Sequence, residues 1–147
     1  MEAMELGALY DAWASRLLAY MMTITRDRSK AEDALHNLFV KLAGGKPDLR
    51  DPSVYLFSAA RNEAIRLSRR RREKPLADLD VLAAPSESAG LRDALDKLPS
   101  DQLDVVVLHV FEGLTFRETA DVLGIPQDTA ASRYRYALDK LRELLDS

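Results

Sequence analysis

The segment GLTFRETADVLGIPQDTAASRYRYALDKL, residues 113–141, constrains the fold of this chain more than any other. Thr115 and Glu118 have the spacing of a capping box, in which a hydroxyl and a carboxylate accept backbone N–H groups that a helix start leaves unpaired. Gly124 is suited to end that helix, and Pro126 fits the first turn of a second one. The pattern predicts two helices joined by a very short turn, a helix-turn-helix.

The second of these helices has a predicted buried stripe and a polar face. The stripe consists of Ala130, Tyr134, Leu138 and Leu141. Polar side chains in its N-terminal half are left outside, where guanidinium groups and phenols can meet phosphates or base edges. The candidate DNA-binding residues there are Gln127, Thr129, Ser132, Arg133, Arg135 and Tyr136. A helical hairpin with a solvated charged face remains the alternative from the pattern alone.

Three more helical patterns occupy the N-terminal half. Apolar spacing predicts the first over about residues 4–25 and the third over about residues 52–72. The second is predicted to start at a capping box of Ser29 and Glu32 and to end at the glycine pair 44–45. On the third helix, a face separate from the buried one carries Tyr55, Asn62, Arg66 and Arg69.

Residues 74–90 contain two prolines and weak hydrophobicity, which is typical of a flexible linker. A short helix is predicted over about residues 91–98, and Ser100 is a suitable N-cap for the next helix. That next segment, DQLDVVVLHVFEG, also suits a strand, but its length and its apolar spacing, with Leu103 and Val110 on one stripe, favour a helix. The predicted fold is all-α, with two small helical domains, residues 1–73 and 91–147, joined by the flexible linker 74–90.

Charge is distributed unevenly along the chain. The net charge is +3 over residues 1–73, −2 over 74–90 and −4 over 91–147. Six basic residues in RLSRRRREK, residues 66–74, suggest an acidic polymer nearby.

Composition argues against several classes of protein. The chain has no cysteine, two isolated histidines and no glycine-rich phosphate loop, so we expect no enzyme, metal site or cofactor. His109 lies beside an apolar stripe and is expected to be structural. No apolar run approaches the length of a membrane span, and the acidic N-terminus lacks a basic signal-peptide start, so a cytoplasmic protein is expected.

The motifs resemble those of bacterial RNA polymerase sigma factors, especially the extracytoplasmic-function (ECF) type. Residues 98–142 contain L-P-x-x-x-x-x-V, E-G-x-T-x-x-E-x-A-x-x-L-G-x-P and T-x-x-S-R-x-x-x-A-x-x-x-L-R, which are similar to region 4 of that family. AEDALHNLFVKLA and DPSVYLFSAARNEAIRLSRRRRE resemble its region 2, namely the helix that grips the polymerase clamp and the helix that melts the promoter and reads the minus-10 element. The resemblance covers nearly the whole chain.

The resemblance implies a sigma factor, which directs RNA polymerase core to promoters and initiates transcription. Its implied partners are core polymerase (clamp and flap), promoter DNA as duplex and as melted strand, and an anti-sigma factor. The implied polymerase-binding residues are Asp33, His36, Asn37 and Lys41. The implied melting and minus-10 residues are Tyr55, Arg61, Asn62, Arg66, Arg69 and Arg70. They combine an aromatic surface with a basic track, as single-strand capture requires.

This sequence departs from the family pattern at several positions. His36 and Asn37 stand where Gln and an acidic residue are common, and Tyr55 stands where Trp is usual. Ala131 and Tyr136 replace frequent basic residues, so minus-35 readout by the helix-turn-helix is expected to use fewer cations.

Two other functions remain possible from the sequence. A stand-alone helix-turn-helix regulator would leave residues 55–72 unexplained. A protein that only sequesters polymerase would not need Asn62 and the arginine run.

Overall fold

The computed structural model describes residues 1–68 and 89–146. All regular structure in this part of the chain is helical, which confirms the predicted all-α class. The chain divides into two compact units, Met1–Glu73 and Lys74–Ser147. Most of the predicted linker, residues 74–88, lies outside the described residues. None of the described helices is long and apolar enough to cross a membrane.

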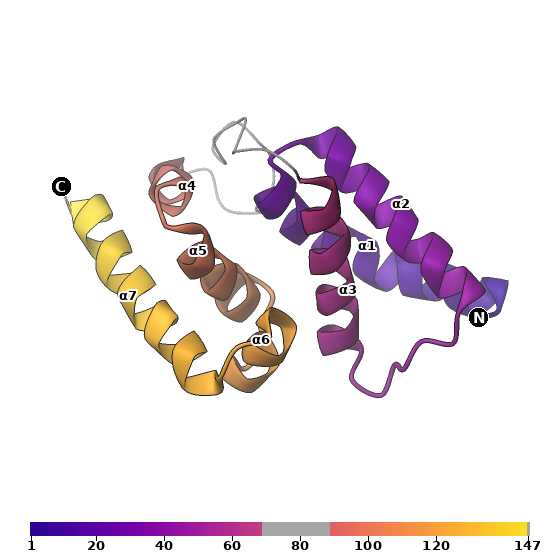
Figure 1. The fold of residues 1–147 in the computed structure, drawn as a ribbon. Coiled ribbons are helices and arrows are strands. Elements are labelled where there is room, and N and C mark those ends of the chain that lie inside the picture. The colour runs from indigo at the N-terminus through magenta and orange to yellow at the C-terminus, as the bar shows by residue number, and fades with distance from the viewer. Residues whose placement is uncertain (69–88, 147) are drawn as a thin grey trace. The chain divides into compact units, whose positions relative to one another are not determined.

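The first unit contains three helices, α1 (Ala3–Thr25), α2 (Arg28–Gly44) and α3 (Pro52–Leu67). Each helix packs against the other two (Figure 1). Their inward faces supply a core of almost fully buried side chains, among them Leu17, Tyr20, Met21, Leu38, Leu42, Leu56, Phe57 and Ala60. Burial of this apolar surface drives the three amphipathic helices together.

Phe57 lies within an aromatic group of this core. Its ring meets the rings of Trp13 and Tyr20 edge-on, with centroid distances of 6.2 and 5.6 Å. The guanidinium of Arg16 lies over the Trp13 ring, 4.5 Å from its centroid. These contacts hold α3 against α1 and thereby set the position of the polar side of α3.

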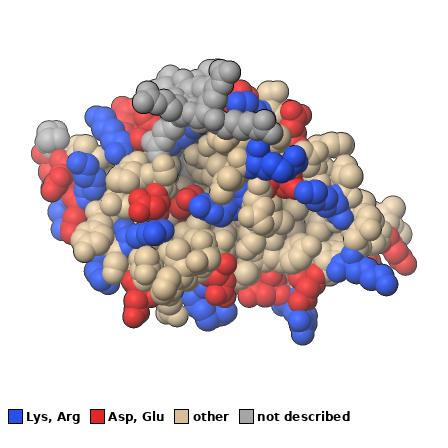
Figure 2. Space-filling view, viewed as in Figure 1, with Lys and Arg blue, Asp and Glu red and all other residues tan. Residues whose placement is uncertain are grey.

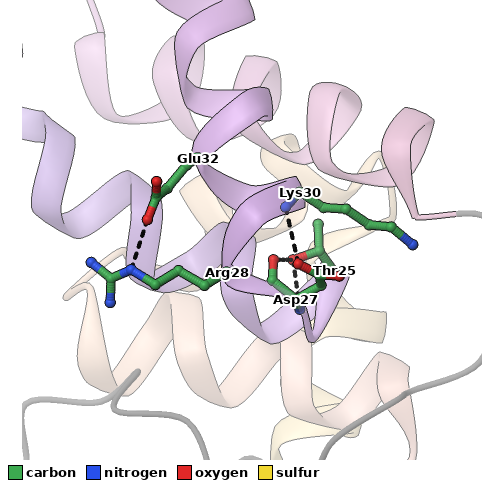
Figure 3. Close-up of polar contacts among 5 residues, drawn as sticks. All are labelled: Thr25, Asp27, Arg28, Lys30 and Glu32. Atoms are coloured by element: carbon green, nitrogen blue, oxygen red, sulfur yellow. Dashed lines mark hydrogen bonds and ion pairs between the residues drawn. The ribbon is translucent and has the colours of Figure 1, made fainter.

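The start of α2 differs from the prediction. Asp27 is the N-cap, and its carboxylate accepts the backbone N–H of Lys30 at 3.2 Å (Figure 3). The predicted capping box of Ser29 and Glu32 is wrong, because Ser29 already lies inside the helix and Glu32 pairs with Arg28 at 2.7 Å. Asp is as effective an N-cap as Ser, and here it occurs two residues earlier.

The end of α3 also differs from the prediction. The helix stops at Leu67 instead of continuing to Arg72, because Ser68 has non-helical backbone angles (φ −94°, ψ 88°). The Ser68 hydroxyl donates a hydrogen bond to the Ile24 carbonyl at 3.3 Å, which ties this end of α3 to α1. The arginines at 69–72 lie outside the described residues.

The second unit contains α4 (Ala89–Asp96), α5 (Ser100–Val106), a π-helical turn η3 (Val107–Phe111), α6 (Phe116–Leu123) and α7 (Gln127–Asp146). The long helix α7 packs against α4, α5 and α6 (Figure 1). It therefore forms the support on which the shorter helices of this unit are assembled.

The helix-turn-helix prediction is confirmed by α6 and α7. The Thr115 hydroxyl accepts the Glu118 N–H at 3.0 Å, and the Glu118 carboxylate accepts the Thr115 N–H at 2.9 Å. Gly124 ends α6 in the left-handed conformation (φ 68°), which a residue with a side chain adopts at a cost. The turn to α7 is consequently as short as the sequence predicts.

The start of α5 corrects another prediction. Pro99, and not Ser100, occupies the N-cap, and no side chain caps this helix. The Pro99 carbonyl accepts the N–H groups of Gln102 and Leu103 at 3.0 and 2.9 Å. Ser100 is the first helical residue.

Two predicted core residues are exposed. Val110 is 51% exposed, because the π-helical turn η3 changes the residues per turn and rotates Val110 away from the stripe that begins at Leu103. Leu138 is 36% exposed, and Ala137 is buried in its place.

Candidate nucleic-acid interface

A cavity of about 220 Å³ lies between α2 and α3 in the first unit. It is lined by Leu38, Lys41, Leu42, Tyr55, Ala59, Asn62 and Glu63. The lining joins Tyr55 and Asn62, two predicted strand-binding residues, with Lys41, a predicted polymerase-binding residue. We name this cavity the α2–α3 pocket.

The two described arginines of the predicted basic track differ in their surroundings. Arg61 is half-buried, and its guanidinium donates to the Tyr20 hydroxyl at 3.3 Å. Arg66 is exposed and donates to the Glu63 carboxylate at 2.7 Å. Arg61 is thus anchored to α1, whereas Arg66 lies at the surface beside the pocket. Arg69 and Arg70 lie outside the described residues.

The carboxylate of Glu63 is buried, with only 4% of the residue exposed, and it bonds two cations. One oxygen accepts from Lys41 of α2 and the other accepts from Arg66 of α3. Sequence reasoning missed Glu63. Its spacing of three from Arg66 was visible, but the pairing with Lys41 joins residues on different helices.

These ion pairs affect the protonation of Glu63. Burial raises the pKa of Glu63, but hydrogen bonds and charge from Lys41 and Arg66 outweigh it and leave the pKa below its ordinary value of 4.5. The ionised carboxylate therefore stabilises the folded unit at neutral pH. This contribution is lost as the pH falls below 4.5 and through the lowered pKa.

Three of the four predicted polymerase-binding residues lie on the outer side of α2. Asp33 and His36 are exposed and Asn37 is half-buried. The Lys41 side chain is 66% exposed, but its ammonium is bound to Glu63 at the α2–α3 pocket. Lys41 therefore stands apart from the other three in its surroundings.

The second helix of the helix-turn-helix, α7, is the predicted recognition helix, and the predicted DNA-binding residues occupy its N-terminal half. They are all exposed or half-buried: Gln127, Thr129, Ser132, Arg133, Arg135 and Tyr136. Arg135 donates to the Ser132 hydroxyl at 3.0 Å, and Tyr136 is 64% exposed. Arg133 lies 3.6 Å from the Asp101 carboxylate and forms an ion pair with this residue of α5.

An aromatic cluster supports the recognition helix from behind. His109 stacks on Phe116 with a centroid distance of 4.1 Å, and Tyr134 meets both rings edge-on. Nδ1 of His109 donates to the Leu114 carbonyl at 2.7 Å, since a carbonyl can only accept. His109 is therefore structural, as predicted. The cluster joins η3, α6 and α7 and thereby fixes the orientation of α6 relative to α7.

Charge on the visible surface is mixed. Figure 2 shows Lys and Arg beside Asp and Glu across the face in view, without a continuous field of one sign. No group of three or more potential metal ligands occurs among residues 1–68 and 89–146.

Comparison with known proteins identifies both units. Residues 9–74 match the family Sigma-70 region 2, and residues 94–143 match the family Sigma-70, region 4. Over 92% of its length the chain is 30% identical to the ECF RNA polymerase sigma factor RpoE of Cereibacter sphaeroides, of which it covers 83%. The chain belongs to the ECF RNA polymerase sigma factor family.

Further relatives agree with this assignment. The ECF sigma factor SigL of Mycobacterium tuberculosis is 28% identical, with 96% of this chain and 89% of SigL covered. Among solved structures, CnrH in complex with the cytosolic domain of CnrY has a TM-score of 0.75 at 27% identity, covering 99% of this chain and 90% of that one. The sigma factor RpoE of Bartonella quintana, solved with the anti-sigma factor NepR, shares the fold, with a TM-score of 0.67 at 23% identity and coverages of 97% and 95%.

As an ECF sigma factor, the protein directs RNA polymerase core to specific promoters and initiates transcription. Its binding partners are therefore core polymerase and promoter DNA. Both regions occur in one chain and in the order expected for the family. A stand-alone regulator would leave the first unit unexplained.

Proposed function

We propose that residues 1–73 act as region 2 and hold the unpaired promoter strand at the α2–α3 pocket, with Tyr55 stacking on a base and Asn62 bonding to one. The observation that carries this proposal is that both side chains line one cavity. Base stacking on aromatic rings and a basic surface for phosphates are the means by which proteins capture single strands. Arg61, Arg66, Arg69 and Arg70 supply the basic surface in this proposal.

Tyr55→Ala tests strand capture. We expect the loss of roughly 1–3 kcal/mol of stacking free energy, so that fewer open complexes form while polymerase binding persists. Permanganate footprinting of thymines in the promoter bubble measures this. Tyr10→Ala is the matched control, because Tyr10 is also an exposed tyrosine of this unit and packs on Phe39 away from the pocket. A bubble of unchanged intensity with Tyr55→Ala would show that Tyr55 does not hold the strand.

We propose that residues 91–147 act as region 4 and that the start of α7 reads the minus-35 element. The contacts assigned to this readout are Gln127, Thr129, Ser132, Arg133, Arg135 and Tyr136. Arg135 is the strongest candidate for a base edge, because its guanidinium is exposed and oriented by Ser132. Arg133 is held in place by its ion pair with Asp101, and we assign it a phosphate contact. Residues 74–90 act as the linker between the two regions.

Arg135→Ala should weaken use of the minus-35 element by roughly 1–3 kcal/mol if the guanidinium reads a guanine edge. Transcription from a panel of mutated minus-35 elements measures this, and the loss should then depend on the base opposite Arg135. A loss of equal size on every template would indicate a phosphate contact instead. Arg142→Ala, an exposed arginine near the end of α7, is the control. If Arg135→Ala matches that control on all templates, Arg135 has neither role.

We propose that Asp33, His36 and Asn37 on the outer face of α2 contact the polymerase clamp, and that region 4 contacts the flap. Sigma factors regulate initiation and do not catalyse it, and we propose that this chain likewise has no enzymatic activity of its own and acts in the cytoplasm. Cell fractionation that places the chain outside the cytoplasm would contradict the last point.

The likeness to CnrH, solved with the cytosolic domain of CnrY, supports an additional protein partner for this chain, which we propose to be an anti-sigma factor. Such a partner should prevent binding of core polymerase when added to the purified sigma factor. A co-purifying protein that leaves polymerase binding unchanged would not have this role.

A further inference from the structure

Glu63 joins the two helices that form the α2–α3 pocket. Its side chain is 6% exposed, whereas the side chains of Lys41 and Arg66 are 66% and 53% exposed. The anion thus lies inside the protein, and the two cations that it binds extend to the surface from different helices. Each carboxylate oxygen has its own cation, so the group carries a net charge of +1 beside the pocket.

We propose that Glu63 is a positioning residue for strand capture, which fixes Lys41 and Arg66 beside the α2–α3 pocket so that both contact phosphates of the unpaired strand. The proposal rests on the proposed function of the pocket. It assigns Lys41 to DNA, although its place on α2 predicted a contact with polymerase. The shared lining of the pocket by Lys41, Tyr55 and Asn62 supports this assignment.

Both cations can bind phosphate while they remain bonded to Glu63. An ammonium has three N–H donors and a guanidinium has five, and each group donates a hydrogen bond to one carboxylate oxygen. Release of the cations is unfavourable, since it would leave a buried, unpaired carboxylate. The donors that remain are held in a restricted set of directions. Without Glu63, the two long side chains would regain their rotamer freedom, and ordering them on DNA would cost more.

A positioning role and a purely electrostatic role predict opposite results. Glu63→Gln removes a negative charge next to the proposed strand, so charge alone predicts tighter binding of DNA. Loss of positioning predicts weaker binding despite the added positive charge. A role limited to stability predicts a lower Tm with unchanged affinity of the folded protein. The sign of the change in affinity therefore separates these roles.

The experiment uses fluorescent forked DNA that is unpaired through the minus-10 region. Its binding to holoenzyme containing each full-length variant is measured over a series of salt concentrations. Lys41→Met should weaken binding roughly fourfold at 0.15 M salt and lower the salt slope by about 0.7, the contribution of one phosphate on a single strand. Glu63→Gln should weaken binding at least as much. The control Arg28→Met removes one charge from the far end of α2, where Arg28 pairs with Glu32, and should leave binding unchanged.

A double variant completes the test. Because Glu63 acts through Lys41 and Arg66, Glu63→Gln combined with Lys41→Met should lose less affinity than the sum of the two single losses, whereas Glu63→Gln with Arg28→Met should be additive. Forked-DNA affinity that is unchanged or increased in Glu63→Gln, with a folded protein by thermal melting, overturns the inference. If wild-type holoenzyme itself fails to prefer forked DNA over duplex, the proposed strand site is wrong. This outcome is distinguishable from failure of the Glu63 inference, because it appears already without any substitution.

Discussion

The isolated sigma factor should bind duplex promoter DNA weakly at physiological salt, and core polymerase should increase its apparent affinity by about 10²–10⁴-fold. Neutralisation of phosphates supplies most non-specific DNA affinity and requires a local excess of Lys and Arg. Residues 91–147 instead carry a net charge of −4, although they include the recognition helix. In the proposed mechanism, polymerase anchors region 2 and holds region 4 near the promoter, so that a weak contact with DNA becomes an intramolecular one.

Anisotropy titrations with and without core polymerase measure this effect. Asp33→Lys is the matched variant, because Asp33 is exposed on the outer face of α2 and its substitution should weaken polymerase binding without unfolding the unit. In this variant, core polymerase should increase the apparent affinity for duplex DNA less than in the wild type. The weak DNA binding of the free protein should stay the same. Specific duplex binding by the free protein at about nanomolar Kd, the range of autonomous DNA-binding proteins, would contradict the mechanism.

Phe57→Ala should destabilise the first unit by about 3–5 kcal/mol, because it leaves a cavity where a fully buried ring packs in the core. Phe57 is fully buried, and its neighbours Trp13 and Tyr20 belong to another helix. A small domain is stable by only about 5–15 kcal/mol, so this loss is a large share of the total. With α3 released from α1, the α2–α3 pocket and the proposed strand-binding arrangement of Tyr55 and Asn62 should be disrupted.

The single tryptophan of the chain, Trp13, reports on this unit alone. Urea unfolding followed by tryptophan fluorescence should therefore show the full loss for Phe57→Ala. Phe116→Ala, a substitution in the other unit, should leave the Trp13 transition unchanged. If Phe57→Ala lowers the free energy of unfolding by less than about 1 kcal/mol, the neighbouring side chains must fill the space that the ring occupied.

The sequence alone was sufficient for the elements whose causes are local. The helix-turn-helix depends on Thr115, Glu118 and Gly124, which act on backbone groups within a few residues of themselves, so their spacing can be read directly. The exposed positions of Tyr55 and Asn62 followed from helical periodicity in the same way. At the start of α2 the prediction from Ser29 and Glu32 was wrong, because Asp27, which caps helices equally well, accepts the Lys30 N–H instead.

The tertiary structure decided the contacts between side chains that are distant in the sequence. Only packing of α2 against α3 brings Lys41 to Glu63, and only packing of α5 against α7 brings Asp101 to Arg133. The π-helical turn at Val107–Phe111 likewise has no signal in the apolar pattern. Periodicity specifies which face of a helix is buried, but the neighbour that buries it depends on how the helices cross. The charge environment of each candidate DNA-binding residue depends on that neighbour, because Coulomb interactions act through space and not along the chain.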